Sequence, residues 1–159
     1  MISKTYNFVT QLHIAIYNTI FNIFLHFFAV IPDTCDSAIN LQDITSPFSG
    51  ATTGARNDYN TSCGGNGPES IFFLDLDPGY KLTIGQTSNS YDSRHQLAYG
   101  GSCPGINTVN CIDDPDTEAI SWENRLNNAE RVYFMIDAYS SRNGSFTIEW
   151  EIEGNVFEV

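Results

Sequence analysis

The feature that most restricts the fold of this chain is a strict alternation of apolar and polar residues near its C-terminus, over residues 145–153. The apolar positions are Phe146, Ile148, Trp150 and Ile152, and Thr147, Glu149 and Glu151 lie between them. A period of two places successive side chains on opposite faces of a β-strand. We therefore expect a strand with one face in a hydrophobic core and the other in water.

Three further segments carry a similar strand signal. Residues 131–139 also alternate, and residues 140–144, between the two strands, are rich in turn formers, which predicts a hairpin. Residues 70–76 and 80–86 are β-prone runs on either side of Asp77-Pro78-Gly79, where proline presets φ and glycine accepts a positive φ. This pattern predicts a second hairpin.

Weaker strand signals occupy much of the remaining chain. They cover residues 38–42, 49–55, 95–99, 107–112 and 119–122. A series of about seven to nine short strands separated by turns is typical of a sandwich or jelly roll. We therefore predict an all-β fold, an antiparallel, jelly-roll-like β-sandwich over residues 32–159, preceded by an apolar helix or signal segment over residues 1–31.

The four cysteines restrict how this domain is closed. They are Cys35, Cys63, Cys103 and Cys111. Their even number, without a C-x-x-C pair or a histidine at zinc-ligand spacing, predicts two disulfides and an oxidising compartment. Four cysteines allow three pairings. Because Cys103 and Cys111 bracket a short loop rich in proline, glycine and asparagine, we predict that they pair, which leaves Cys35 with Cys63.

The charge balance restricts the partners of the chain. It has 19 acidic and 7 basic residues, a formal net charge of −12, and all of its acids follow Ile31. An acidic surface repels phosphate backbones, so we predict no nucleic-acid partner. Cations, or a basic or uncharged surface, fit this charge better.

Residues 1–31 are a different kind of sequence. They contain no acid, one lysine near the start, and an apolar, aromatic run over residues 14–31 that a few polar residues interrupt. A basic start before such a run is typical of a secretory signal, although a good cleavage site is missing. The run also reaches the minimum length of a membrane anchor. Near one helical face lie Asn7, Gln11, Asn18 and Asn22, as in a packing or interfacial helix. These alternatives stay open, and the first two predict a secreted or cell-surface domain.

A series of short motifs runs through the domain in a fixed order. They include Cys35-Asp36-Ser37-Ala38, Gly50-Ala51-Thr52-Thr53-Gly54-Ala55, Gly67-Pro68-Glu69, Gly100-Gly101-Ser102-Cys103, Cys111-Ile112-Asp113-Asp114 and Tyr133-Phe134-Met135-Ile136-Asp137-Ala138-Tyr139. Together these motifs resemble the bacterial pre-peptidase C-terminal domain, a β-sandwich module of secreted proteins, over residues 33–153. The resemblance implies a jelly-roll-like sandwich, the two disulfide pairings given above, and a non-catalytic accessory role beside a hydrolase or on a cell surface. Members of that family usually follow a catalytic domain, for which these 159 residues leave no room.

Two oxygen-rich groups are candidate calcium sites. Asp113, Asp114 and Asp116 lie on a turn that a proline keeps from becoming helical, and hard cations bind such clusters of carboxylates. Asn57, Asp58 and Glu69 form the second group, which a Cys35–Cys63 bridge would bring near one edge of the domain. The alternatives are a solvated acidic turn for the first group and side chains that cap their own backbone for the second. Calcium is therefore a predicted ligand, and no cofactor is required.

The inventory of catalytic groups is thin. His95 is the one histidine after residue 31, and the chain has no G-x-S-x-G motif. We therefore predict a non-catalytic extracellular binding or accessory module that recognises a glycan, a protein or a cell surface. The alternative is a structural subunit that self-associates in an extracellular filament or surface layer, with possible membrane contact through residues 1–31. A hydrolase with paired carboxylates is a third hypothesis, because sequence does not show the separation of carboxylates.

Overall fold

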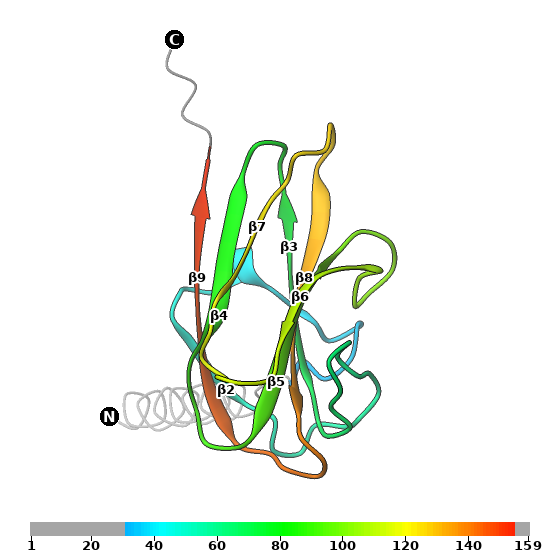
Figure 1. Cartoon of the computed structure of the whole chain (residues 1–159), viewed down its shortest axis with the longest axis vertical. Coiled ribbons are helices and arrows are strands. Elements are labelled where there is room, and N and C mark those ends of the chain that lie inside the picture. The colour runs from blue at the N-terminus through cyan, green and yellow to red at the C-terminus, as the bar shows by residue number, and fades with distance from the viewer. Residues whose placement is uncertain (1–30, 155–159) are drawn as a thin grey trace, which may run out of the picture. The chain divides into compact units, whose positions relative to one another are not determined.

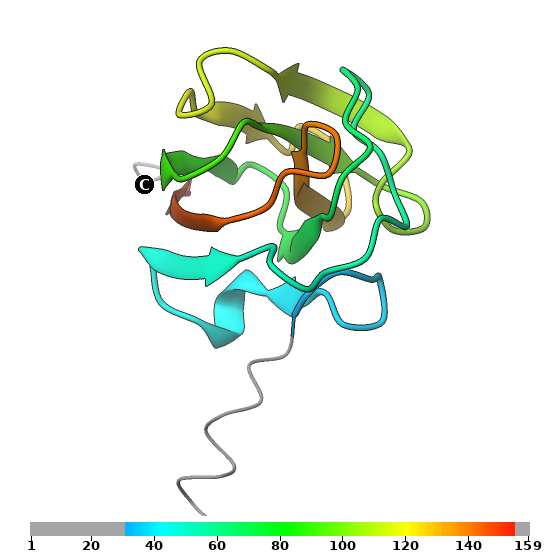
Figure 2. The ribbon, with the colours of Figure 1, turned by 90° about the horizontal axis from the view of Figure 1, so that it is seen from below.

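The computed structural model describes residues 31–154, which form two β-sheets packed against each other (Figures 1 and 2). Residues 1–30, the predicted signal, anchor or packing helix, and residues 155–159 lie outside the described part. The three interpretations of the N-terminal segment and its boundary with the domain therefore stay predictions. No helix within residues 31–154 has the length and apolar character needed to cross a membrane.

The larger sheet has five strands in the order β1-β3-β8-β5-β6. Its strands are β1 (Ile39–Asn40), β3 (Ser70–Leu76), β5 (Ser93–Tyr99), β6 (Asn107–Ile112) and β8 (Glu130–Ala138). All neighbours are antiparallel except β1 and β3, which form a short parallel pair. β8 is the central strand, and β6 forms one edge.

The smaller sheet has four antiparallel strands in the order β2-β9-β4-β7. Its strands are β2 (Phe48–Ala51), β4 (Lys81–Asn89), β7 (Ile120–Glu123) and β9 (Ser145–Glu153). A short 3-10 helix, η1 (Leu41–Asp43), follows β1 and is capped by the Asn40 side chain, which accepts a hydrogen bond from the N–H of Gln42. The predicted all-β architecture with two sheets is confirmed.

The core lies between the two sheets and follows the alternation seen in the sequence. Phe146 and Ile148 of β9 are buried in it, whereas Glu149 is exposed on the other face of the strand. Phe72 of β3 meets Phe146 edge to face, with ring centroids 6.1 Å apart. Phe134 of β8 belongs to the same cluster. Removal of this apolar surface from water, at about 25 cal/mol per Å², is what holds the two sheets together.

Both predicted hairpins are wrong, although their strands and turns are present. β8 lies in the larger sheet and β9 in the smaller one, and β3 and β4 are divided in the same way. The connections 139–144 and 77–80 therefore cross from one sheet to the other. The physical reason is that the apolar faces of each pair meet across the core, whereas a hairpin would place them side by side. In the described part, β5 and β6 are the only consecutive strands that pair with each other.

The predicted pairing of the cysteines is also wrong. All four form disulfides, but the bonds are Cys35–Cys103 and Cys63–Cys111, each with Cα atoms 5.8 Å apart. The extended strand β6 occupies most of the sequence between Cys103 and Cys111 and carries the second cysteine away from the β5–β6 turn. Each of these cysteines instead meets one from an earlier segment that crosses the outer face of the larger sheet.

Candidate functional site

Part of the outer face of the larger sheet, over β3 and β8, is covered. Ile71, Tyr133 and Met135 lie outside the main core and are nevertheless buried, in a second apolar cluster. Cys35 and Tyr59, from segments that precede β3, pack against this cluster. The two disulfides thus fasten an early part of the chain onto this face, while Asp75 and Arg131 stay exposed at the other end of β3 and β8.

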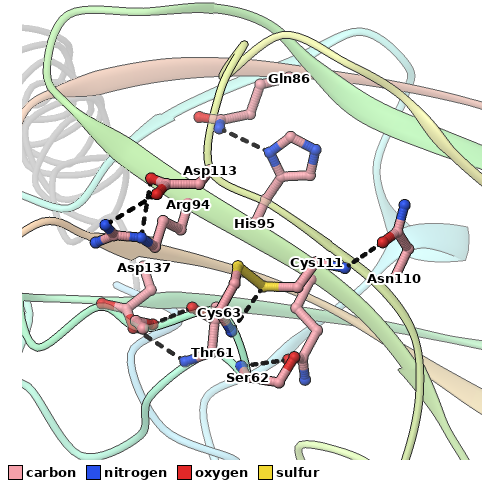
Figure 3. The surroundings of a disulfide bond; sticks show 12 residues. Thr61, Ser62, Cys63, Gln86, Arg94, His95, Asn110, Cys111, Asp113 and Asp137 are labelled. Carbon is pink, nitrogen blue, oxygen red and sulfur yellow. Dashed lines mark hydrogen bonds and ion pairs between the residues drawn. A yellow bond between two sulfur atoms is a disulfide. The ribbon is translucent and has the colours of Figure 1, made fainter.

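Asp137, near the end of β8, holds the loop over residues 56–69 to the sheet (Figure 3). Its Oδ2 atom accepts a hydrogen bond from the N–H of Thr61 at 3.1 Å, and its Oδ1 atom accepts one from Gly67 at 3.4 Å. Gly65 has a φ of +94°, and a Cβ atom there would overlap the Asp137 carboxylate. Burial raises the pKa of Asp137 to about 6, against the opposite effect of the backbone hydrogen bonds and of Arg94.

Glu69 supports the same loop from its other end. Its Oε1 atom accepts hydrogen bonds from the N–H groups of Asp58 at 2.7 Å and Tyr59 at 2.9 Å, while its Oε2 atom is buried without a hydrogen-bond partner. Burial raises the pKa of Glu69 to about 7, the two N–H groups lower it, and the charges of Asp137 and Asp58 raise it further. The carboxylates of Glu69 and Asp137 therefore both bind main-chain N–H groups of the loop over residues 56–69, and these contacts fix the position of the loop.

Arg94 of β5 lies next to this cluster (Figure 3). Its Nε atom lies 2.9 Å from Oδ1 of Asp113, and its guanidinium stacks over the ring of Tyr139 with 4.9 Å to the centroid. Next to it the N–H of Ser62 donates to Oε1 of Gln96 at 2.6 Å. The sequence singles out Glu69 and Asp58, which the structure brings together, but the alternation of residues 131–139 places Asp137 on a solvent-facing side, so its part in this cluster was missed.

The three aspartate side chains of the first predicted calcium group point in different directions. Asp113 pairs with Arg94, Asp114 is exposed, and Asp116 turns toward the interior, where its Oδ2 atom accepts hydrogen bonds from the N–H of Ser93 at 3.1 Å and from the side chain of Asn89. Asp116 therefore closes the β4–β5 turn from the side of the 113–119 connection.

The second predicted calcium group makes contacts within the loop over residues 56–69. The side-chain amide of Asn57 donates to the carbonyl of Asn66 at 2.9 Å, and the carboxylate of Asp58 lies 3.6 Å from Nε of Arg56. Within residues 31–154, no three side chains of His, Cys, Asp or Glu are grouped so that they could hold a metal ion. Calcium binding stays a prediction.

His95 is a buried strand residue. Its Nε2 atom lies 2.7 Å from the carbonyl oxygen of Glu118 and therefore carries the proton, and its Nδ1 atom accepts from the side-chain amide of Gln86 at 3.3 Å. Its ring packs against Phe134, with centroids 5.4 Å apart. Burial lowers the pKa of His95 and keeps the ring neutral. The histidine thus links the two sheets inside the sandwich.

The outer face of the smaller sheet is open and acidic. Glu149, Glu151 and Glu153 alternate along β9, opposite Gly85, Thr83 and Lys81 of β4. A shallow groove of about 230 Å³ follows this face, lined by Thr83, Gly85, Thr87, Ala119, Glu149, Trp150 and Glu151. We call this surface the β9 face. It carries three glutamates in a row on a rigid sheet, and small residues on β4 leave their side chains room.

Gly85 is what allows the groove to form at this point. A Cβ atom at Gly85 would lie 2.7 Å from the Cα atom of Ala119, so only glycine lets the chain before β7 approach β4 this closely. Beyond the groove Lys81 pairs with Glu153 at 2.6 Å, beside Glu123 of β7. The alternation of 145–153 predicted the exposed glutamates, but it did not show which strands would flank them.

Comparisons with known proteins leave the family of the chain unassigned. No protein-family model matches it, and no curated protein sequence matches it. Among solved structures it is similar to PliG from Aeromonas hydrophila, a periplasmic lysozyme inhibitor of g-type lysozyme, with 11% sequence identity and a TM-score of 0.48 over 73% of this chain and 96% of that one. The β-sandwich implied by the resemblance to the pre-peptidase C-terminal domain is observed, and membership of that family stays a prediction.

Proposed function

We propose that this chain is a non-catalytic binding module that works outside the cytoplasm and holds a protein with a basic surface on the β9 face. The observation that carries the proposal is the asymmetry of the sandwich. The outer face of one sheet is partly covered by disulfide-linked loops, whereas the other presents Glu149 and Glu151 beside a shallow groove. A rigid, flat and charged surface suits a folded protein partner of opposite charge.

Two further properties of the chain support this proposal. The two disulfides, Cys35–Cys103 and Cys63–Cys111, are typical of proteins that fold in an oxidising compartment. The net charge of −12 creates a long-range field that attracts cationic proteins and speeds their association. The buried carboxylates and His95 are occupied by backbone or core contacts, so the proposal assigns them to stability.

The proposal is tested by the affinity of the purified domain for a panel of basic proteins, measured by calorimetry, with acidic proteins of similar size for comparison. The panel includes a g-type lysozyme, the enzyme that PliG inhibits. We expect binding of at least one basic protein, with an affinity that decreases as the salt concentration increases. We expect Glu149→Gln/Glu151→Gln to weaken this binding by about tenfold and to reduce its salt dependence.

The matched control is Asp36→Asn/Asp92→Asn, which removes the same charge from exposed positions that do not line the groove. This control is expected to bind nearly as well as the natural sequence. Equal weakening by both double variants would assign the effect to net charge alone and contradict a site on the β9 face. Binding of a polysaccharide panel without binding of any basic protein would replace the proposal with the glycan hypothesis.

A further inference from the structure

Two asparagines of the chain lie in the sequence pattern that accepts an N-linked glycan. The pattern is an asparagine with serine or threonine two positions later and any residue except proline between them. It occurs twice, as Asn60-Thr61-Ser62 and as Asn143-Gly144-Ser145. Both asparagines are exposed, so exposure alone does not distinguish the two sites. Their hydrogen bonds do.

Asn143 lies in the connection between β8 and β9, the orange loop at the bottom of Figure 1. Its Oδ1 atom accepts a hydrogen bond from the hydroxyl of Thr53 at 3.0 Å, and its Nδ2 atom donates to the carbonyl of Ser141 at 3.4 Å. Because an asparagine amide carries two N–H groups, one N–H of Asn143 has no partner among the described residues. A sugar bonded to Nδ2 takes the place of that N–H and leaves both hydrogen bonds intact.

Asn60 lies in the loop over residues 56–69 and is held differently. In the amide orientation that satisfies its surroundings, its Nδ2 atom donates to the carbonyls of Gly65 and Tyr59, each at 3.1 Å. Both N–H groups are therefore occupied, and a sugar on Nδ2 would remove one of these hydrogen bonds. The next residue, Thr61, is buried. A glycan at Asn60 would therefore disturb a loop that packs onto the sheet.

The two residues after Asn143 differ in how far the fold explains them. A Cβ atom at Gly144 would lie 2.3 Å from the hydroxyl oxygen of Ser90, so glycine allows this close approach. Glycine also leaves the segment free to adopt the conformation that a transferase imposes on it before the domain folds. The hydroxyl of Ser145 is exposed, and its hydrogen bond to Ser90 at 3.2 Å is one that water can replace. The fold thus explains the glycine better than the hydroxyl.

We propose that Asn143 is the attachment site of an N-linked glycan and that Asn60 stays unmodified. The donor is an oligosaccharide bonded through a diphosphate to a lipid carrier, in the compartment where the two disulfides form. The Nδ2 atom of Asn143 forms a bond to the anomeric carbon of the first sugar while the bond from that carbon to the diphosphate breaks. The lipid diphosphate leaves with the electron pair and the amide loses one proton, so nothing is oxidised or reduced.

The attachment point is separate from the groove of the β9 face. Because a strand rises about 3.3 Å per residue, Glu149 and Glu151 lie about 13 Å and about 20 Å along β9 from Ser145. The glycan would therefore extend from the end of the sandwich where β9 begins. The inference shares with the proposed function only the location outside the cytoplasm, and a glycan at Asn143 requires no protein partner.

The inference is tested on the protein isolated from the cells that make it, by intact mass and by mapping of its glycopeptides. We expect a mass above that of the peptide chain and a glycan on the peptide that contains Asn143. Release by a peptide N-glycosidase should convert Asn143 to aspartate, and it should proceed on the folded protein because the site is exposed. An unmodified Asn143 peptide would overturn the inference. A glycan on Asn60 would overturn the structural distinction between the two sites.

Variants of the full chain, secreted from a eukaryotic host, show whether the acceptor pattern is responsible. Ser145→Ala removes the hydroxyl of the pattern and is expected to abolish the glycan, whereas Ser145→Thr, the matched control at the same position, is expected to keep it. Asn60→Gln should leave the glycan unchanged. A glycan that persists in Ser145→Ala, or that is lost from both Ser145 variants, would contradict attachment at Asn143.

Discussion

At the scale of single residues, the buried carboxylates of Glu69 and Asp137 hold a loop in place by hydrogen bonds, although their burial costs free energy. Each carboxylate accepts hydrogen bonds from two backbone N–H groups of the loop over residues 56–69. Such hydrogen bonds to a charged group are stronger than those between neutral groups. Burial nevertheless raises the pKa of both carboxyl groups, which means that their ionised forms are disfavoured in the folded protein. The Oε2 atom of Glu69, buried without a partner, is where this cost is greatest.

We therefore predict that Glu69 makes the folded protein less stable as the pH increases. The pKa of Glu69 is about 7 when folded and 4.5 as an ordinary carboxyl, so its stabilising protonated form is fully present below about pH 4.5 and lost as the pH rises through 7. Glu69→Gln keeps an oxygen for the two N–H groups and does not ionise. At about pH 8 we expect this variant to be about 1–3 kcal/mol more stable than the natural sequence in urea unfolding.

The comparison of the two proteins at each pH isolates this effect from other titrations. His95 acts in the opposite direction, because its lowered pKa withdraws stability as the pH falls below about 6.5, but it is present in both proteins. Asp137 is also common to both. The difference between the variant and the natural sequence should shrink from pH 8 to pH 5. A difference that is constant across this range would contradict the assignment.

At the scale of elements, strand positions could be predicted from the sequence and strand partners could not. Residues 107–112 were predicted as a strand and are β6 with the same bounds, because local alternation and turn formers determine where a strand begins and ends. The partner of β8 is determined by which apolar faces meet in three dimensions, and no local pattern contains that information. Tyr133 and Met135, apolar residues on the side of β8 expected to face water, were the one signal that this face would be covered.

The disulfides give the prediction that belongs to this scale. Peptide mapping of the unreduced protein should find Cys35 with Cys103 and Cys63 with Cys111, and a Cys103–Cys111 peptide would contradict the structure. Because the bonds span 68 and 48 residues, Cys35→Ser/Cys103→Ser and Cys63→Ser/Cys111→Ser should each lower the free energy of unfolding by about 4 kcal/mol. Urea unfolding of the two variants and of the natural sequence measures both losses under the same conditions.

At the scale of the whole molecule, the described residues divide their surface into three kinds. One outer face is partly covered by disulfide-linked loops, the β9 face is open and acidic, and residues 99–112 contain no charged side chain. Composition predicted the acidity, but only the two-sheet arrangement places Glu149 and Glu151 on one face and Ile106 on a different part of the surface.

The net charge of −12 also has a consequence for the stability of the domain. Repulsion among acidic groups disfavours the compact state. At physiological ionic strength, dissolved salt largely screens the repulsion between exposed charges that are more than about 8–10 Å apart. We predict that sodium chloride raises the Tm of the dilute protein by about 2–5 °C between low and physiological ionic strength. Calcium chloride at the same ionic strength is the control. An equal shift of the Tm in both salts assigns the effect to screening. A larger shift in calcium chloride that Asp113→Asn/Asp114→Asn abolishes would mean that calcium binds at the first predicted group. An unchanged Tm in both salts would contradict the role of repulsion.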